Sequence, residues 1–354
     1  MSFWKDKAVL VTGGASFIGS HLVDALVAKG ARVHVVDNLS SGKLPNIQGY
    51  IDQRSVQFIH GDLLDPVVVS KSVRNIEIVF HLAANHGGRG YVDLRQVECS
   101  TNLILDGLLF REALRAGVQK IVYASSGCVY PNHIQTNPKE EKYLTEELVG
   151  PPYDADNLYG WAKLLGELTL RSYYQQHSLK SVSCRYFTVY GPRGKENHAV
   201  LAMIARAFIG ADPFEVWGTG EQIRNWTYVS DIVSGTLLAG EKIDDASAVN
   251  LGTMERIRVV DAVKMILEFT GHKASLQFRP EMPTGPLNRV ADNGRAKMLL
   301  GWKPQVVFRE GVKKTIDWYY KERNKDVVQS ELADILIERQ QSKDSNLTAT
   351  AKIQ

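Results

Sequence analysis

The stretch Ala8-Val-Leu-Val-Thr-Gly-Gly-Ala-Ser-Phe-Ile-Gly-Ser-His21 decides the fold of this chain of 354 residues. The apolar run at residues 8–11 predicts a buried strand, and the pattern over 17–29 predicts a helix directly after a tight turn. Gly13 and Gly19 stand where the backbone must turn sharply and approach a pyrophosphate at the N-terminus of that helix. The stretch therefore predicts the opening strand, turn and helix of a dinucleotide-binding fold.

The same alternation of short apolar runs and helical patterns continues through the first half of the chain. Expected strands are Ala8–Val11, Val33–Val36, Gln57–Ile59, Ile78–Phe80, Ile121–Tyr123 and Val182–Cys184. Expected helices lie near Phe17–Lys29, Pro66–Val73, Thr101–Ala116 and Tyr159–His177. This alternation is typical of a parallel sheet with helices on both faces. We therefore expect an α/β fold, a Rossmann-type doubly wound parallel sheet with a smaller α+β substrate-binding lobe.

Asp37 ends the second expected strand, in Val35-Val-Asp-Asn-Leu-Ser-Ser-Gly42. A carboxylate at this position accepts hydrogen bonds from the adenosine ribose hydroxyls and repels a 2′-phosphate, which favours NAD over NADP. A glycine-rich turn alone can be structural, and a lone aspartate can be a solvated turn residue. Strand, turn, helix and acid at these separations together predict NAD as the cofactor.

The second half of the chain has a different pattern. After about residue 186 the alternation loosens, and glycines, prolines and aromatic residues become frequent. We expect an NAD-binding Rossmann domain over 1–185, to which the chain returns near 225–250, and a substrate lobe over 186–322. Residues 323–354 are expected to form a C-terminal helix, reaching about residue 341, and a flexible tail. The cleft between the lobes is the expected ligand site.

Composition and charge exclude several classes of protein. Lys plus Arg number 42 and Asp plus Glu number 39, so the net charge of 42 − 39 = +3 does not favour nucleic acid or an anionic membrane as partner. The three cysteines, Cys99, Cys128 and Cys184, lack metal-ligand spacing, so no metal site and no disulfide are expected. The N-terminus lacks a signal-peptide pattern, and a cytoplasmic, soluble protein is expected.

Several motifs occur together in this chain. They are Gly13-x-x-Ser16-x-x-Gly19, Gly61-Asp-Leu63, His81-Leu-Ala-Ala84, Ser125-Ser126, Tyr159-x-x-x-Lys163 and Arg185-Tyr-Phe-Thr-Val-Tyr-Gly-Pro-Arg193. Over residues 6–320 the chain resembles the extended short-chain dehydrogenases/reductases, and among them the nucleotide-sugar epimerase/dehydratase family. Ser16 departs from that pattern, because the family usually has glycine there. The resemblance implies that NAD is bound by Gly13, Ser16, Phe17, Ile18, Gly19, Asp37, Asn38, Ser41, Gly42, Asp62, Leu63, Leu82, Ala83, Ala84, Asn102, Tyr159, Lys163 and Tyr186.

Tyr159 and Lys163 form the expected redox pair. They are four residues apart on a predicted helix and therefore share one face. A neighbouring ammonium and an oxidised nicotinamide both favour the phenolate, so we expect a lowered pKa for Tyr159, which would take a proton from a sugar hydroxyl. Ser126 is expected to hydrogen-bond the same hydroxyl. By itself a Tyr-x-x-x-Lys spacing is a common surface pair.

The residues beside the redox pair bear on the reaction. Related 4,6-dehydratases carry an Asp-Glu pair after the catalytic serine or threonine, where this chain has Gly127-Cys128, so dehydration is not expected. The stretch Ser126-Gly-Cys-Val-Tyr-Pro131 resembles GDP-mannose 3,5-epimerases and GDP-fucose synthases, in which the cysteine is an acid/base. His198 matches a histidine of the latter group that partners the cysteine. The alternatives are a small core residue for Cys128 and a helix-start residue for His198.

The second lobe adds candidate substrate contacts. Phe214-Glu-Val-Trp-Gly-Thr-Gly220 followed by Arg224 resembles the GDP-sugar-binding stretch of both enzyme groups. The flat face of Trp217 suits a base or ribose, and arginine forks suit a diphosphate. The substrate-binding residues implied are Gly87, Gly88, Arg89, Ser126, Asn197, Arg206, Trp217, Arg224 and Arg289.

These patterns predict an NAD-dependent nucleotide-sugar epimerase, with GDP-mannose 3,5-epimerase favoured. The partner would be a nucleotide-diphosphate sugar, and Ser126, Cys128, Tyr159, Lys163 and His198 would be catalytic. The alternatives are a UDP-hexose 4-epimerase, a GDP-fucose synthase, which Asp37 disfavours because that enzyme consumes NADPH, and a catalytically silent sensor of NAD or nucleotide sugar. The expected helices over 101–116 and 159–177 resemble those that form a four-helix homodimer interface in this family.

Overall fold

Seven parallel strands form the central sheet in the order β11-β6-β5-β4-β1-β2-β3. The computed structural model describes residues 2–330 and 332. The strands are β1 (Ala8–Thr12), β2 (Arg32–Asp37), β3 (Val56–His60), β4 (Ile78–His81), β5 (Lys120–Ser126), β6 (Lys180–Tyr186) and β11 (Asp245–Leu251). This order, with a reversal between β1 and β4, is that of a Rossmann fold, so the expected fold class is confirmed.

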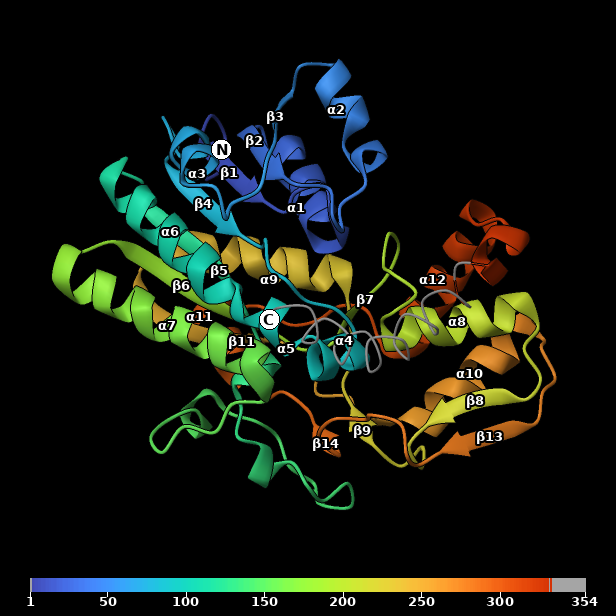
Figure 1. Cartoon of the computed structure of the whole chain (residues 1–354). Coiled ribbons are helices and arrows are strands. Elements are labelled where there is room, and N and C mark those ends of the chain that lie inside the picture. Colours follow the sequence, from blue (N-terminus) through green and yellow to red (C-terminus); the bar gives the residue numbers. More distant parts are fainter. Residues whose placement is uncertain (1, 331, 333–354) are drawn as a thin grey trace, which may run out of the picture.

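Helices cover both faces of the sheet (Figure 1). On one face, α1 (Phe17–Ala28) and α9 (Val229–Lys242) pack against strand residues that include Val9 and Val11. On the other face, α3 (Pro66–Ser72), α6 (Asn102–Arg115) and α7 (Asn157–His177) pack against residues that include Leu10. Successive strand residues alternate between the two cores because side chains of a strand point to opposite faces.

Each of the six expected strands is present, and each is longer than its apolar run. The seventh strand, β11, pairs with β6 and was not among the expected strands. Its sequence, Asp-Ala-Ser-Ala-Val-Asn-Leu, mixes polar and apolar residues. Its pairing with β6 shifts in register between Asp245 and Ala248. Helix α9 and strand β11 carry residues 229–251 back to the sheet.

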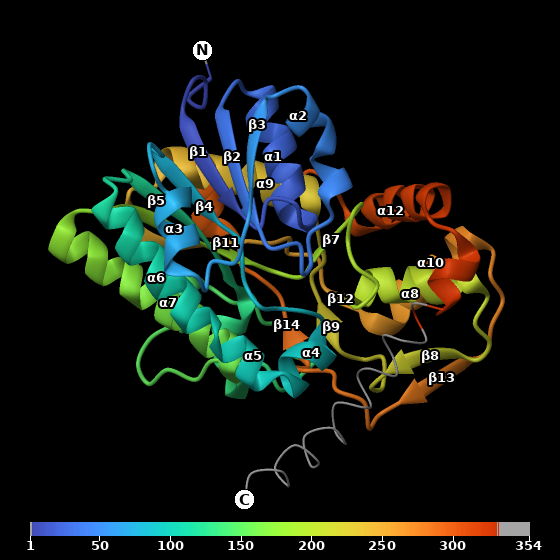
Figure 2. The ribbon, with the colours of Figure 1, turned by 45° about the horizontal axis from the view of Figure 1, so that its top comes forward.

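A second lobe lies beside this sheet domain (Figure 2). Its core is formed by α8 (Ala199–Ile209), α10 (Val259–Thr270), α12 (Phe308–Glu322) and the parallel pair β8 (Phe214–Trp217) and β13 (Leu276–Arg279). Strand β9 (Ile223–Arg224) pairs with both β12 (Ile257–Arg258) and β14 (Asn288–Arg289), and β7 (Val189–Tyr190) pairs with β10 (Thr227–Tyr228). Mixed parallel and antiparallel pairing with separate helices is the α+β lobe that was expected.

Shorter elements complete the described chain. They are α2 (Gln48–Asp52), α4 (Arg89–Leu94), α5 (Gln96–Ser100), α11 (Gly294–Leu300) and 3-10 turns at Leu44–Asn46, Gly127–Val129, Asn132–Ile134 and Glu146–Leu148. Beyond α12 the chain is helical again over 325–330, and the rest of the helix expected up to 341 and the expected tail lie outside the described residues. Within the described part, every helix is too short or too polar to cross a bilayer.

Candidate active site

The carboxyl edge of the sheet gathers the residues predicted to bind the cofactor. The glycine-rich turn follows β1, Asp37 ends β2, Asp62 follows β3, Ala83 follows β4 and Tyr186 ends β6. Because all seven strands are parallel, these positions share one edge, which is where ligands bind in open α/β sheets. The reversal of strand order lies between β1 and β4, beside the glycine-rich turn.

The turn after β1 has the shape that a pyrophosphate requires. Gly13 has φ +68°, and a Cβ on Gly19 would lie 2.1 Å from the carbonyl oxygen of Gly13. Ser16 begins α1 but makes no side-chain cap, because its hydroxyl donates to Gly13 O at 2.5 Å. The first amides of α1, at Phe17 and Ile18, are therefore left for an anion.

Asp37 is nearly buried, with 7% of its surface exposed. Its carboxylate accepts hydrogen bonds from the amides of Ala15 (3.0 Å) and Leu39 (2.8 Å). Burial raises the pKa of Asp37, and those two hydrogen bonds oppose the shift. A Cβ on Gly42 would lie 2.7 Å from the carboxylate, so glycine keeps this side of Asp37 open. Each carboxylate oxygen retains a lone pair for a ribose hydroxyl.

The last residue of β5 is Ser126, and the first turns of α7 carry Tyr159 and Lys163. The Ser126 hydroxyl accepts from Cys128 N at 3.1 Å and hydrogen-bonds the Tyr159 side chain. The pKa of Tyr159 is raised, because burial and the nearby Cys128 outweigh the hydrogen bond from Ser126. The lowering expected from the sequence depends also on an oxidised nicotinamide, and in the protein alone desolvation of the phenolate raises the pKa instead.

Lys163 is 1% exposed, and its Nζ has no hydrogen-bond partner among the described residues. The ammonium lies 4.6 Å from the centroid of the Tyr123 ring. Burial lowers the pKa of Lys163, and Asp106 and Glu167 oppose that shift. An unsatisfied buried ammonium is costly in a folded protein. An ammonium in this position could donate hydrogen bonds to the hydroxyls of a ligand, such as those of the nicotinamide ribose.

A buried network that sequence reasoning missed supports this region. The amides of Leu82 and Ala83 donate to Thr12 Oγ1, each at 3.0 Å, so the Thr12 hydrogen points to His81 Nδ1 at 2.8 Å. His81 then donates from Nε2 to Asp106 Oδ1 at 3.0 Å. The network fixes the backbone that follows β4. Asp106 also accepts from the hydroxyl of Tyr123 at 2.5 Å, beneath Lys163.

Cys128 faces an arginine. Arg289 donates from Nη1 to Sγ of Cys128 at 3.3 Å, and from Nη2 to Asp156 at 2.9 Å. Arg89 donates to the same oxygen of Asp156 at 2.7 Å. Burial would raise the pKa of Asp156, but Arg289 and Arg89 outweigh it and lower the pKa. Asp156, which precedes α7, was also missed, since an aspartate before a helix is an ordinary capping residue.

His198 begins α8, and its ring centroid lies 5.9 Å from that of His86. The His86 ring in turn lies 6.4 Å from the Tyr159 ring. Desolvation by the surrounding protein, with Lys163 and Lys195, lowers the pKa of His86 to about 4. The His86 ring therefore lies near the rings of both Tyr159 and His198. Only Gly87, Gly88 and Arg89 of this loop were predicted from the sequence as site residues.

Arginines dominate the side of the cleft that belongs to the second lobe. Arg224 and Arg289 are register partners on β9 and β14. Arg224 donates to two backbone carbonyl oxygens, and burial together with Arg289 and Arg89 lowers its pKa to about 9. Arg206 on α8 is 7% exposed, and no hydrogen bond or ion pair of its guanidinium occurs within the described residues. This excess of positive charge suits a diphosphate.

Other predicted contacts have clear positions. The amide of Asn102 is bonded at both ends to the backbone of Asn85, so it holds the loop after β4. Leu63 packs in the core, and the hydroxyl of Tyr186 is bonded to Thr236 on α9. Asn38 donates to Asp62 at 3.0 Å at the exposed end of the cofactor groove. Trp217 is partly buried on β8, and Asn197 directly precedes His198.

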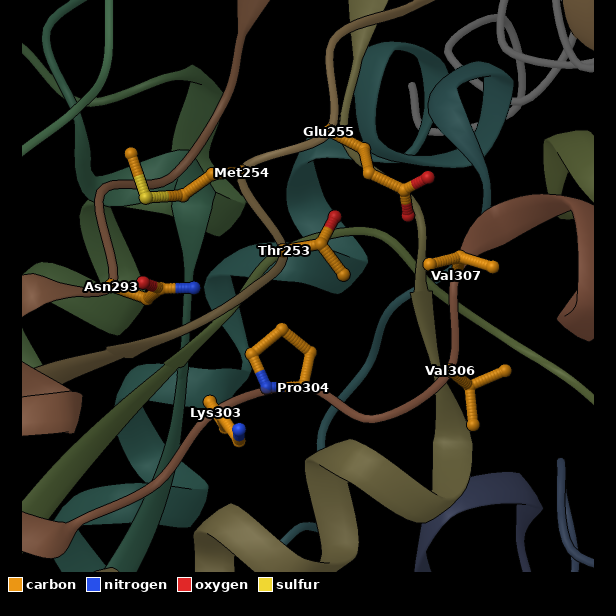
Figure 3. Close-up of a pocket in the computed structure, with 8 residues that line it drawn as sticks. All are labelled: Thr253, Met254, Glu255, Asn293, Lys303, Pro304, Val306 and Val307. Atoms are coloured by element: carbon orange, nitrogen blue, oxygen red, sulfur yellow. The ribbon is translucent and has the colours of Figure 1, made fainter.

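Two further cavities lie apart from these residues. A cavity of about 410 Å³ is lined by Thr253, Met254, Glu255, Asn293, Lys303, Pro304, Val306 and Val307 (Figure 3). A groove of about 600 Å³ lies between α1 and α9. No residue predicted for the site lines either one. In the described part of the chain, no cluster of histidine, cysteine and carboxylate side chains could hold a metal ion, and all three cysteines are free.

A parallel sheet whose carboxyl edge carries these groups beside a basic cleft defines an enzyme of the Rossmann type that uses a dinucleotide. The chain belongs to the NAD-dependent epimerase/dehydratase family, whose model matches residues 9–252. NAD is its cofactor.

Individual relatives carry out different reactions. The chain is 32% identical to UDP-glucuronic acid decarboxylase 1 of Xenopus tropicalis, over 89% of this chain and 73% of the relative. A structure of UDP-glucose 4-epimerase from Thermotoga maritima with UDP-glucose has 33% identity and a TM-score of 0.79, covering 88% of this chain and 98% of that one. UDP-glucose 4-epimerase of Thermus thermophilus with NAD has 29% identity and a TM-score of 0.78, covering 89% and 99%.

Proposed function

We propose that this chain is a nucleotide-sugar epimerase that exchanges protons at C3 or C5 of the sugar, with GDP-mannose as substrate. The observation that carries this proposal is the position of Cys128, held by Arg289 beside the Ser126 and Tyr159 pair. The resemblance of Phe214–Gly220 to GDP-sugar-binding stretches supports the choice of nucleotide.

Tyr159 and Ser126 would perform the proton transfer of the redox step. NAD, when bound, accepts a hydride from C4 of the sugar and later returns it. Tyr159 takes the proton of the C4 hydroxyl, while Ser126 holds that hydroxyl in place. The positive charge of Lys163, whose ammonium has no hydrogen-bond partner among the described residues, would favour the phenolate during this step. A carbonyl at C4 makes the hydrogens at C3 and C5 acidic.

Cys128 and His198 would then exchange those protons. Cys128 follows the end of β5, and His198 begins α8 in the other lobe, so the two groups approach the cleft from different lobes. One group removes a proton from a face of the ring and the other supplies one to the opposite face. Return of the hydride to C4 completes the epimerisation and leaves NAD unconsumed.

Deuterium exchange tests this proposal. The purified enzyme is incubated in deuterated water with GDP-mannose and, separately, with UDP-glucose, UDP-glucuronic acid and dTDP-glucose, and products are followed by NMR. We expect solvent deuterium at C3 or C5 of GDP-mannose. We expect Cys128→Ser to stop wash-in at one carbon face and His198→Asn to block net epimerisation. Near wild-type epimerisation and labelling in both variants would contradict the assignment.

A UDP-hexose 4-epimerase is the second candidate, and the relatives favour it. Two relatives of about 30% identity are UDP-glucose 4-epimerases, and the chain aligns with nearly their whole length. In that reaction Cys128 and His198 only shape the pocket, and the 4-keto sugar receives its hydride on the other face. Inversion at C4 of UDP-glucose without solvent deuterium would identify this activity.

We also propose a homodimer that uses α6 and α7. These helices lie side by side (Figure 1) and expose the apolar side chains Leu103, Ile104, Leu158, Trp161 and Leu165. Positions 158, 161 and 165 follow helical spacing, so they form one stripe. A second copy would cover both helices and make a four-helix interface. Light scattering should give twice the mass of the chain, and Leu165→Glu should yield monomers.

A further inference from the structure

Residues 192–196 cross from the sheet domain to the second lobe and are fixed at both ends. At the first end, His21 Nε2 is bonded to Pro192 O at 3.0 Å, and Arg193 forms an ion pair with Asp24 at 2.8 Å. Both partners belong to α1, the helix that follows the glycine-rich turn. The segment is therefore attached to the sheet domain through α1.

The other end of the segment is attached to α12. The carboxylate of Glu196 accepts from the hydroxyl of Tyr319 at 3.0 Å and pairs with Arg323 at 3.1 Å. Between these anchors lies Lys195, whose carbonyl oxygen accepts from His198 N at 3.1 Å. Its backbone is thus held from both sides and by the start of α8.

The side chain of Lys195 has no hydrogen bond and no ion pair within the described residues, although it is half-buried. The two carboxylates near it are already engaged: Glu196 with α12, and Asp37 with the amides of Ala15 and Leu39. Lys43 is also close, and its amide donates to Ala15 O at 2.9 Å beside the glycine-rich turn. The positive charges of Lys43 and Lys195 are close enough to affect each other.

The charge of Lys195 acts along the cofactor groove. Burial lowers the pKa of Lys195, Lys43 lowers it further, and Glu196 and Asp37 oppose the shift. Lys195 also lowers the pKa of His86, which follows β4. Lys195 therefore lies within electrostatic range of both Asp37, which ends β2, and His86, which follows β4.

We propose that Lys195 binds the diphosphate of the dinucleotide from the side of the second lobe. The amides at the start of α1 hold this group from below, and the Lys195 ammonium supplies a charge-assisted hydrogen bond from the opposite side. The diphosphate of the sugar nucleotide is a different anion, and its candidate partners are Arg206, Arg224 and Arg289. Nucleotide binding would thereby link the sheet domain to the segment that carries His198.

Binding of cofactor fragments to the full-length protein freed of nucleotide tests this role without catalysis. Titration calorimetry compares NAD, ADP-ribose, adenosine, GDP and UDP for the wild type, Lys195→Met, Lys195→Arg and the control Lys29→Met, an exposed lysine after α1. We expect Lys195→Met to weaken NAD and ADP-ribose about tenfold, as for loss of a charged hydrogen bond. Adenosine binding should not change, and Lys195→Arg should retain most of the affinity.

Three results would overturn the proposal. They are equal NAD affinity in the wild type and Lys195→Met, an equal loss for adenosine, and a loss confined to GDP or UDP. The last would assign Lys195 to the sugar nucleotide. Because these measurements use no sugar substrate, they stand apart from the proposed epimerase reaction. A smaller salt dependence of NAD binding in Lys195→Met would give independent support.

Discussion

Arg289 and Cys128 are hydrogen-bonded across the two halves of the site, with 3.3 Å between Nη1 and Sγ. Arg289 lies on β14, and Cys128 follows the last strand residue of β5, so the contact joins positions 161 residues apart. Cys128 is partly buried and lies against a cation, unlike the buried Cys99 and Cys184. This contact is the structural basis for the proposal that Cys128 takes part in proton exchange.

The first prediction concerns this contact. Arg289→Met removes the donor that faces the sulfur, so deuterium wash-in by Cys128 should slow about tenfold or more at saturating nucleotide sugar. Transfer of hydride from C4, followed as transient NADH absorbance, should persist. Arg295→Met, an arginine bonded to Glu147 away from the cleft, is the control. Unchanged wash-in in Arg289→Met would show that Arg289 does not act on the cysteine.

The second prediction concerns the proton acceptor. Tyr159→Phe keeps the ring but removes the hydroxyl that Ser126 contacts, so turnover should fall by roughly 10²–10⁴. Affinity for the nucleotide sugar should change little. The control is Tyr174→Phe, an exposed tyrosine on the same helix. Retained turnover in Tyr159→Phe would remove this residue from the mechanism of both epimerase reactions.

The third prediction concerns cofactor choice. Asp37→Ala removes the carboxylate at the adenosine ribose, so the Kd for NAD should rise about tenfold and the preference over NADP should shrink. The exposed Asp52 on α2 serves as control, as Asp52→Ala. Catalytic amounts of NAD should support many turnovers. Stoichiometric consumption of NADPH would instead indicate a reductase.

The fourth prediction concerns pH and stability. The pKa of Asp156 lies below its usual 3.8 in the folded chain. The ion pairs of Asp156 therefore stabilise the fold fully above about pH 3.8. This stabilisation is lost as pH falls through the lowered pKa of the folded state. Asp156→Asn should cost about 3 kcal/mol at pH 7, as expected when a buried ion pair loses one partner.

Chemical denaturation at several pH values measures this cost. The difference between the wild type and Asp156→Asn should disappear as pH falls through the lowered pKa of Asp156. Asp154→Asn, at a carboxylate that is 44% exposed, should cost much less at every pH. A difference that does not depend on pH would mean that the ion pairs do not carry the effect.

Local patterns allowed much of the fold to be predicted. The β1–α1 unit, Asp37 and the Tyr159–Lys163 spacing are each encoded within about 30 consecutive residues, where periodicity and turn chemistry act directly. Strand β11 was not predicted because Asp245, Ser247 and Asn250 interrupt its apolar pattern. Its place beside β6 depends on pairing with residues more than 60 positions away.

The sequence by itself determined the parallel sheet and the glycine-rich turn, and it indicated Asp37 and the Tyr159–Lys163 pair as candidates, because these follow from neighbouring residues. Only the tertiary structure decided the electrostatics of the site. Burial, which no residue pattern measures, raises the pKa of Tyr159 instead of lowering it. The partners of Asp156 are Arg89 and Arg289, which lie far from it in the chain. Asp106 likewise contacts His81 and Tyr123. Such contacts exist only when separate elements fold together, since desolvation and hydrogen bonding depend on what the whole chain places around each group.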